Sequence, residues 1–432
     1  AGRGWLRGHR PEWLFIVATL AMLAQRIAED HHTFFIDPGA SWGTSEWMIN
    51  YSAGFVRRGL GGAVLGEVLR LTGIRFFPFW VVAGTLSFAG LCAYVLRITW
   101  RLRGPGLWRL ALLLNPILLI TACHYGTYAR KDLVFVWATL LNVAVCGQML
   151  ANARRSVAWR AVILLLTFAG CGTVLALLHE GLLPFSWLPI NLAVCAYALR
   201  QLGLRRRTVA LLLILGMAPA GAAVAGAALH HGNAQMARTI CESWQGAAPV
   251  KCQEEAQMPP EVERLGWSLP RGIALAAPIA PMFPLYPVLL ILAGGLEILA
   301  IRILMPAARL EHLLATLLLA FVASLPLYVL GVDWGRWLAL TGMCSLLVML
   351  SERMRPACYR CLPALLRRAV DGMTPSAERF LRAMRRTFER DFGLFCAALL
   401  LLEVPPIPVG IVEFLNPSLV WLMKLGLHLG SR

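Results

Sequence analysis

The chain has 432 residues, of which 58% are hydrophobic, whereas a soluble globular protein is about 45–50% apolar. The apolar residues come in blocks of about 18–22, the length of a helix that crosses a lipid bilayer, which argues against a soluble protein. The formal net charge is +17, but the arginines lie in short loops between the apolar blocks, so we expect no nucleic-acid partner.

The apolar blocks predict an all-α, polytopic helical membrane protein with about 11 transmembrane helices, in a range of about 10–12. Continuous apolar blocks are typical of membrane helices rather than of barrel strands, which alternate. The block 272–301 contains four prolines and could begin as a broken or re-entrant segment. The expected spans lie near residues 12–28, 76–97, 109–123, 132–150, 161–178, 181–199, 208–229, 272–301, 312–330, 337–350 and 392–411.

The distribution of basic residues predicts the orientation. With the N-terminus in the cytoplasm, the inside loops hold 26 Lys and Arg residues and the outside loops hold 11, which agrees with the positive-inside rule. We therefore expect a multi-pass protein of a bacterial inner membrane, with periplasmic loops at 29–75 and 230–271. Cys241 and Cys252 share the second of these loops, and a disulfide between them is plausible if that loop is periplasmic.

The expected organisation has three parts: a transmembrane core over residues 1–350, a basic cytoplasmic segment over 351–391, and one or more C-terminal membrane helices over 392–432. In the basic segment, Thr374 and Pro375 are good helix-starting residues. Apolar residues on one face with arginines around them indicate an amphipathic helix lying on anionic lipid headgroups. The alternative is an ordinary positive-inside loop.

The first outer loop holds the first cluster of polar residues, with the acids Asp30, Asp37 and Glu46 in its first part. After Ser52 the apolar pattern becomes helical, and Ser52 could cap this helix. Gly62 and Gly66 form a pattern of small residues typical of helix packing. Two arginines near a helix N-terminus can bind a phosphate; the alternative is an anchor to lipid headgroups. The candidate ligand-binding residues are Asn50, Tyr51, Arg57 and Arg58.

Three further clusters fall on the same predicted face of the membrane, where charges near the apolar zone are costly and often functional. The first joins two spans, the second lies between two apolar runs with almost no loop, and the third precedes a span. For each, the alternative is structural: local ion pairs, snorkelling side chains, or an interfacial tryptophan anchor. The clusters are His124, Arg130, Lys131 and Asp132; His179 and Glu180; and Asp333, Trp334 and Arg336.

The four clusters together offer cations, carboxylates and aromatic rings on one face. Such a mixture fits a sugar carried on an anionic lipid pyrophosphate. Arginines would hold the pyrophosphate, a carboxylate would accept a proton from the attacking hydroxyl, and aromatic rings would face the sugar. We expect no metal and no cofactor, because arginines can neutralise the leaving group.

Four short motifs also carry a resemblance to a known group of proteins: Asn-Tyr-Ser-x-Gly-Phe-Val-Arg-Arg-Gly-Leu at 50–60, Arg-Lys-Asp at 130–132, His-Glu at 179–180 and Asp-x-Gly-Arg-Trp at 333–337. They resemble bacterial multi-spanning proteins of surface-polysaccharide assembly. The layout is similar to O-antigen and capsule polymerases and, more distantly, to GT-C glycosyltransferases. The resemblance covers residues 30–340 through these motifs alone, and a large soluble sugar-binding domain is missing from the pattern.

The resemblance implies a glycosyltransferase or polymerase that uses polyprenyl-phosphate-linked or polyprenyl-pyrophosphate-linked sugars at the periplasmic face. GT-C enzymes usually carry an acidic pair in the first outer loop, but Glu29 and Asp30 lie very near the end of the first helix. The catalytic base therefore stays open, with Asp30, Asp37, Glu180 and Asp333 as the candidate catalytic carboxylates. The competing hypotheses are a transporter or flippase for a lipid-linked or anionic solute, and a non-catalytic subunit that contacts other envelope-assembly proteins.

Overall fold

The computed structural model describes residues 12–36, 42–115, 118, 129–230, 232–253, 258–267, 270–271, 274, 277–282, 284–330, 333–391 and 395. Two of the candidate site residues, Asp37 and His124, lie outside these ranges, as does nearly all of the predicted span 392–411.

Helices make up most of the described chain, and the long apolar helices among them confirm the prediction of a polytopic helical membrane protein. Six of them are long and apolar enough to cross a membrane. They are α5 (Phe76–Arg101), α8 (Asp132–Ala151), α9 (Val157–Leu178), α11 (Arg206–Leu229), α15 (Leu285–Leu304) and α16 (Leu310–Leu330). The helix α17 (Trp334–Leu350) is apolar but shorter.

Other elements complete the bundle around these six. Helix α2 (Glu12–Ile36) contains the predicted first span and packs against α5 and α6 (Gly106–Leu113). The span predicted near 181–199 is a π-helical turn, Leu183–Trp187, followed directly by α10 (Leu188–Gln201). A 3-10 turn, Ala277–Met282, precedes α15, which agrees with the expectation of a broken segment before this span.

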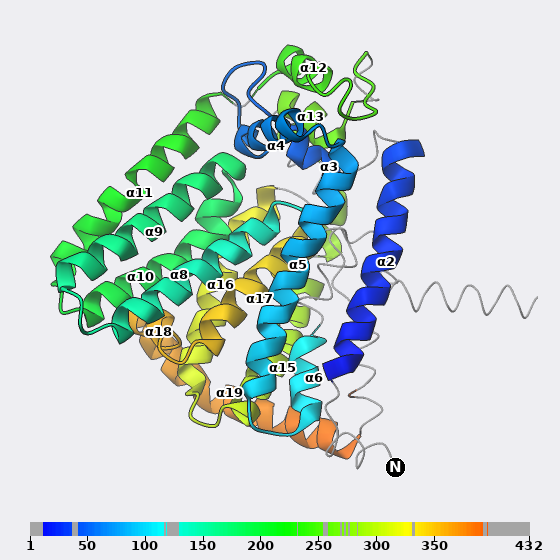
Figure 1. Cartoon of the computed structure of the whole chain (residues 1–432). Helices are drawn as coiled ribbons and strands as arrows, with labels where there is room; N and C mark the ends of the chain where they lie inside the picture. Colours follow the sequence, from blue (N-terminus) through cyan, green and yellow to red (C-terminus); the bar gives the residue numbers. More distant parts are fainter. Residues whose placement is uncertain are drawn as a thin grey trace, which may run out of the picture.

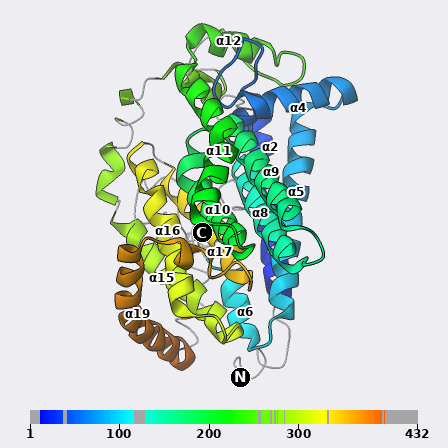
Figure 2. The same ribbon diagram turned by 90° about the vertical axis from the view of Figure 1, so that its left-hand side faces the viewer.

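Helix α17 lies at the centre of the bundle. Every residue of this helix is buried, and it packs against α8, α15 and α16. On one side α8 packs against α9 and α10, and α9 packs against α11, as the two views in Figure 1 and Figure 2 show. A helix that is apolar and buried all round belongs to the interior of a large bundle. Because α17 is packed on all sides, residues at its ends, such as its N-cap residue Asp333, are held in place.

Helices other than the spanning ones gather at the two ends of the bundle (Figure 1). One end, which we call the α4 end, has α3 (Trp42–Ser45), a 3-10 turn (Glu46–Met48), α4 (Gly59–Thr72), α12 (Ala234–Glu242), α13 (Pro260–Glu263) and a 3-10 turn (Arg264–Gly266). The opposite end, the α19 end, has α18 (Ala357–Cys361) and α19 (Ala364–Arg390). Cys241 and Cys252 form a disulfide at the α4 end. This is the pair that the sequence offered for a disulfide in a periplasmic loop.

The start of α4 corrects the prediction of a helix capped by Ser52. The helix begins at Gly59, and Arg58 is its N-cap residue with a left-handed backbone, φ +63°. Arg58 is the one residue other than glycine with positive φ in the part of the chain that the structure describes. Such a conformation is unfavourable for arginine. Here the Lys131 ammonium stabilises it by donating a hydrogen bond of 2.9 Å to the Arg58 carbonyl oxygen.

The loop predicted over 29–75 is also more structured than expected. Its first residues, 29–36, continue α2, and its second half contains α4. Helix α2 continues past its apolar part, because the residues that follow are also compatible with a helix. The apolar pattern shows where a helix meets lipid and does not show where its backbone hydrogen bonds end.

The amphipathic helix of the basic segment begins at Ala364, eleven residues before the predicted start at Pro375. Pro375 lies inside it, and the Thr374 hydroxyl donates to the Val370 carbonyl oxygen, 2.8 Å away, instead of capping a new helix. Its apolar face packs on the bundle: Phe380 and Met384 lie against Gly295 of α15. Packing of that face stabilises the turns on both sides of the proline.

Candidate functional site

Charged side chains from distant parts of the sequence meet at the α4 end in one set of ion pairs, which we call the ion network. It joins residues of all four predicted clusters with two residues of the second outer loop. Its members are the cations Arg58, Arg130, Arg264 and Arg336 and the acids Glu46, Asp132, Glu180, Glu261 and Asp333.

Arg336 is the central cation of the network. Its guanidinium lies 2.7 Å from Asp132 Oδ2, 2.9 Å from Asp333 Oδ2 and 2.8 Å from Glu46 Oε1. Two helix starts bring these groups together, since Asp132 is the first residue of α8 and Asp333 is the N-cap residue of α17. An acid at a helix N-terminus is favoured by the helix dipole, and Arg336 one turn into α17 is placed to pair with both.

Arg130 pairs with Glu46 and, more distantly, with Glu261, whose Oε1 lies 3.8 Å away. Glu46 is fully buried in the 3-10 turn that precedes α4. Burial by itself would raise the pKa of this carboxyl, but Arg130 and Arg336 outweigh burial and hold the pKa well below its usual value. Glu46 is therefore a carboxylate at neutral pH, and its second oxygen has no hydrogen-bond partner among the described residues.

Arg58 connects the network to the loop between α9 and α10. Its guanidinium lies 3.3 Å from Glu180 Oε1 and 3.1 Å from Glu261 Oε2. Burial would raise the pKa of Glu180, but Arg58 and then Arg57 lower it below the usual value. The left-handed backbone at Arg58 thus directs a guanidinium towards two acids that are 81 residues apart in sequence.

Two further cations lie beside the network without an ion pair in the described part of the chain. The Lys131 side chain is 0% exposed, and its ammonium lies 5.8 Å from the centre of the Trp47 ring. Burial lowers the pKa of Lys131 to about 8. The Arg57 guanidinium donates to the Arg264 carbonyl oxygen at 2.7 Å. Counted together with the network, Arg57 and Lys131 bring the site to six cations and five acids, so its positive and negative charges nearly balance.

His179 lies next to Glu180 and is buried. Burial, reinforced by the positive charge of Arg58, holds the pKa of this imidazole well below its usual value. The ring is therefore neutral at physiological pH, and the Leu182 N–H donates to its Nδ1 at 3.4 Å. Because Nδ1 accepts this hydrogen bond, the proton of the neutral ring is on Nε2, which can donate a hydrogen bond.

Two acids of the network remain partly accessible. The side chains of Glu180 and Asp333 are each 18% exposed, whereas those of Glu46, Asp132 and Glu261 are almost completely covered. Burial raises and Arg336 lowers the pKa of Asp333, and the net effect is a lowered value. Glu180 and Asp333 are therefore the carboxylates that a bound molecule could reach.

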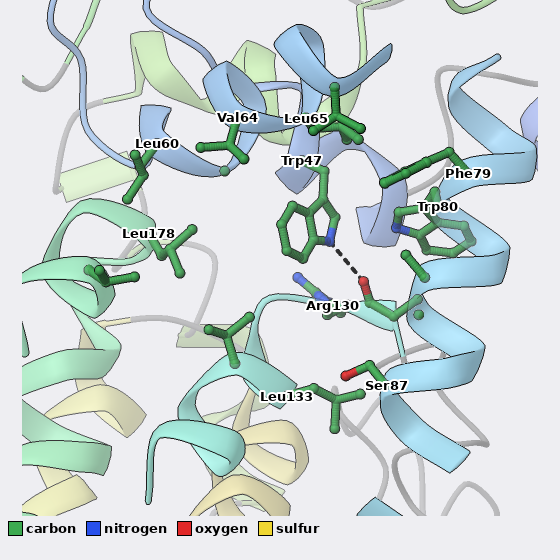
Figure 3. A pocket seen from close by; sticks show the side chains of 17 residues that line it. Trp47, Leu60, Val64, Leu65, Phe79, Trp80, Ser87, Arg130, Leu133 and Leu178 are labelled. Carbon is green, nitrogen blue, oxygen red and sulfur yellow. Dashed lines mark hydrogen bonds between the residues drawn. The ribbon is translucent and has the colours of Figure 1, made fainter. Parts of the chain in front are cut away.

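An apolar pocket of about 390 Å³ lies directly beside the network, between α4, α5, α8 and α9. Figure 3 shows Leu60, Val64 and Leu65 of α4 above it and Phe79 and Trp80 of α5 at its side. The Trp47 indole N–H donates to the Ala129 carbonyl oxygen at 2.8 Å, which fixes this ring in the pocket wall. Arg130 is the one charged residue in the lining.

The pocket opens on the outside of the bundle, because Val64, which lines it, is 56% exposed. One end is therefore open to the surroundings of the spanning helices, and another end reaches the guanidinium of the network. The arrangement can hold an apolar chain with a negatively charged group at its end.

A second, more polar pocket of about 600 Å³ lies on the opposite face of α4. Asn50 and Tyr51 line it, so the structure places these two predicted residues here and not in the ion network. The Asn50 amide donates to the Ser243 hydroxyl at 2.9 Å, which ties this pocket to the disulfide-linked loop.

Two more predicted residues lie apart from the network. Asp30 is in α2, where its carboxylate pairs with Arg26 at 2.8 Å. Trp334 is 2% exposed and its ring packs edge-on against Tyr286, 5.5 Å between centroids, so in this structure it stabilises the start of α17. No group of three His, Cys, Asp or Glu residues suited to a metal ion occurs within the described ranges.

Sequence reasoning did not name Glu261 or Arg264 as site residues, and it counted Glu46 only as one acid of a loop. Glu46 precedes an apolar run, Trp47 to Ile49, and an acid beside such a run is a weak sign of burial. Glu261 follows two prolines in a polar loop, and nothing local distinguishes it from the neighbouring acids. Its role depends on the fold bringing α13 against α3 and α12.

The fold and this site define a polytopic helical membrane protein with a buried ion network and an apolar pocket at one end. The chain belongs to the family described as uncharacterised membrane protein Rv1490, which matches residues 15–253, more than half of its length. The matched part runs from within α2 to beyond α12 and hence contains Glu46, Arg58, Arg130 and Glu180. No curated protein and no solved structure matches the chain.

Proposed function

We propose that this protein is a periplasmic-face glycosyltransferase or polymerase that uses polyprenyl-phosphate-linked or polyprenyl-pyrophosphate-linked sugars in the assembly of a surface glycan. The observation that supports it most is the apolar pocket that ends at Arg130 of the ion network. A polyprenyl donor is a long apolar chain with a phosphate at one end, which is the combination that the pocket and the guanidinium can accept.

The proposal requires that the α4 end face the periplasm of a bacterial inner membrane. Two features support this orientation. The α4 end carries the Cys241–Cys252 disulfide, and disulfides persist in oxidising compartments such as the periplasm. The α19 end carries the arginine-rich α19, and an excess of Lys and Arg is typical of cytoplasmic segments.

The proposed reaction is an inverting transfer. The acceptor hydroxyl oxygen attacks the anomeric carbon, the bond from this carbon to the phosphate oxygen breaks, and the polyprenyl phosphate or pyrophosphate leaves with the electron pair. The hydroxyl proton passes to a carboxylate. Of the acids in the network, Glu180 and Asp333 suit this role best because their side chains are partly exposed and both are ionised.

The arginines of the network are already paired with carboxylates, so they are not free cations waiting for a phosphate. A guanidinium has five N–H donors, and one carboxylate engages only part of them. Arg57 and Lys131, which have no ion pair among the described residues, add positive charge next to the pairs. The network would hold its arginines rigidly and offer their remaining donors to the leaving phosphate, without reorganisation during the reaction.

The experiment that tests the proposal is the profile of lipid-linked glycans in a deletion strain, measured by mass spectrometry. We expect one polyprenyl-linked sugar to accumulate in the outer leaflet and a longer glycan to disappear. An unchanged profile would remove glycan assembly from consideration.

Isosteric variants then test the two accessible acids. We expect Glu180→Gln or Asp333→Asn to lower transfer by about 10²–10⁴-fold if that residue is the base, with normal protein levels in the membrane. Glu242→Gln is the matched control, because Glu242 is an exposed acid at the same end. Loss of protein rather than of activity in both variants would indicate a structural role for these acids.

The apolar pocket is tested by filling it. Val64→Trp places an indole in a position that is open to the surroundings, and we expect it to weaken use of the lipid donor while the protein remains folded. Leu86→Trp is the control, since Leu86 is exposed on α5 but does not line the pocket. Equal activity of the two variants would contradict a donor site in this pocket.

One observation favours the alternative of a transporter or flippase, namely a buried acid inside a spanning helix, Glu297 of α15. The glycan profile separates the two functions. Failed transfer leaves the lipid-linked sugar in the outer leaflet, whereas failed transport leaves it in the inner leaflet.

A further inference from the structure

Glu297 is an acidic residue within the spanning helix α15, far from the ion network along that helix. It is 0% exposed, and neither of its carboxyl oxygens has a hydrogen-bond partner among the described residues. It lies seven residues before the end of α15 at Leu304, which places it about 10 Å from the α19 end of the helix.

Apolar side chains pack closely around this part of α15. Gly294, one turn before Glu297 on the same side of the helix, faces Leu317 of α16. Gly295, on another side of the helix, faces Phe380 and Met384 of α19. One turn before Glu297, the Asn115 amide donates to the Ala293 carbonyl oxygen at 2.7 Å, and within the described residues it makes no hydrogen bond to Glu297.

Several charged groups of the helices that pack against α15 have partners elsewhere. Glu378 of α19 pairs with Arg302, at the end of α15. The others are Arg109 on α6, paired with Glu12; Glu311 on α16, paired with Arg309; Arg336 on α17, in the ion network; and Asp371, bonded to Tyr359, with Glu389 and the arginines at 367, 368, 379, 382, 385, 386 and 390 on α19. The uncharged titratable groups are His312, whose ring packs against Tyr359; Cys344, whose Sγ accepts a hydrogen bond from the Thr139 hydroxyl; and Tyr286 and Tyr328, whose rings pack against each other. Within the described ranges, no ion pair joins any of them to Glu297.

An ionised carboxylate in such a place would have neither water nor a cation to stabilise it, and the free-energy cost is large. The neutral carboxylic acid is far less costly to bury. From this geometry we propose that Glu297 is a proton-binding site: its carboxyl group carries a proton at neutral pH, and it exchanges this proton with the aqueous phase at the α19 end. The inference does not depend on the glycosyltransferase proposal.

Labelling with a carbodiimide tests this site directly. Dicyclohexylcarbodiimide dissolves in the bilayer and reacts with protonated carboxyl groups in apolar surroundings. We expect it to modify Glu297 of the full-length protein in native membranes, as identified by peptide mass spectrometry. The modification should decrease as the pH is raised, because only the acid form reacts.

Two controls establish which group reacts. Glu297→Gln should abolish the modified peptide while the protein level stays normal, because the amide has the shape of the acid and no charge. Glu352→Gln, which changes an exposed acid at the α19 end, should leave it unchanged. A water-soluble carbodiimide should modify Glu352 and leave Glu297 unmodified.

A second measurement covers the case in which the reagent fails to reach the site. The infrared spectrum of the wild type should contain a carbonyl band of a protonated carboxylic acid that is missing from Glu297→Gln. A protein that lacks both the label and this band has an ionised Glu297, and the proposal is then wrong. Neither measurement requires glycan transfer, so their outcome is separate from that of the proposed reaction.

Discussion

The arginines of the ion network each contact more than one group, and this feature decides what substitution of a single residue would do. Arg336 reaches three carboxylates, and Glu46 reaches two arginines. Removing one partner from a buried pair leaves an uncompensated charge and typically costs about 3–5 kcal/mol of stability. For this reason alanine variants of Arg130 or Arg336 would report on folding, whereas amide variants of the partly exposed acids report on chemistry.

Lys131 gives a prediction about pH at the residue scale. The lysine of the unfolded chain keeps its proton up to a pKa of about 10.4, whereas burial lowers the pKa of Lys131 in the folded protein to about 8. Between these two values the unfolded state binds more protons, so the free energy of unfolding increases with pH there. Because one pKa unit corresponds to about 1.4 kcal/mol, the increase is about 3 kcal/mol.

The measurement is the thermal unfolding of the purified protein in detergent from pH 7 to 10. We expect the melting temperature of the wild type to rise relative to Lys131→Met between pH 8 and 10. Lys251→Met is the control, since Lys251 is exposed, and its curve should stay parallel to the wild type. Parallel curves for Lys131→Met as well would show that Lys131 does not titrate in this range.

At the scale of the element, α4 separates the two pockets and approaches the preceding turn very closely. The Gly62 N–H donates to the Ile49 carbonyl oxygen at 3.1 Å, and a Cβ atom on Gly62 would overlap that same oxygen. A Cβ on Gly66, one turn later, would meet Trp244 at an ordinary 3.7 Å. The sequence pattern of two small residues thus contains one position that requires glycine and one that does not.

The matched pair Gly62→Ala and Gly66→Ala tests this difference. We expect Gly62→Ala to destabilise the protein by about 1–3 kcal/mol, because the added methyl group would force the backbone at Ile49 to shift. Gly66→Ala should be neutral or stabilise it by up to about 1 kcal/mol through helix propensity. Melting temperatures compare the two, and equal values would contradict the close approach of α4 to residue 49.

At the scale of the whole molecule, the two ends of the bundle must lie on opposite sides of the membrane if the proposed orientation is right. Cys361 is exposed at the α19 end, and Ser52 is exposed at the α4 end. In spheroplasts we expect a membrane-impermeant maleimide to label Ser52→Cys and to leave Cys361 unlabelled. In inverted vesicles the pattern should reverse, and the opposite result would place the ion network in the cytoplasm.

The sequence by itself determined the class of fold and the approximate positions of the spans. It could do so because transfer of a continuous apolar block into lipid depends on composition and length, which are local properties. The same reasoning placed Arg58, Arg130, Glu180 and Arg336 in one group, since charges beside apolar blocks are costly and need partners. It also gave the cysteine pair that forms the disulfide.

Only the tertiary structure decided which charges pair and which helix ends meet. Glu261 joins Arg58 and Arg130 across 203 and 131 positions, and no local pattern encodes such a contact. The left-handed Arg58, the continuation of α19 through Pro375 and the complete burial of Glu297 were likewise beyond local reasoning. In each case the conformation depends on packing against residues distant in sequence, which offsets a local preference of about 1–3 kcal/mol.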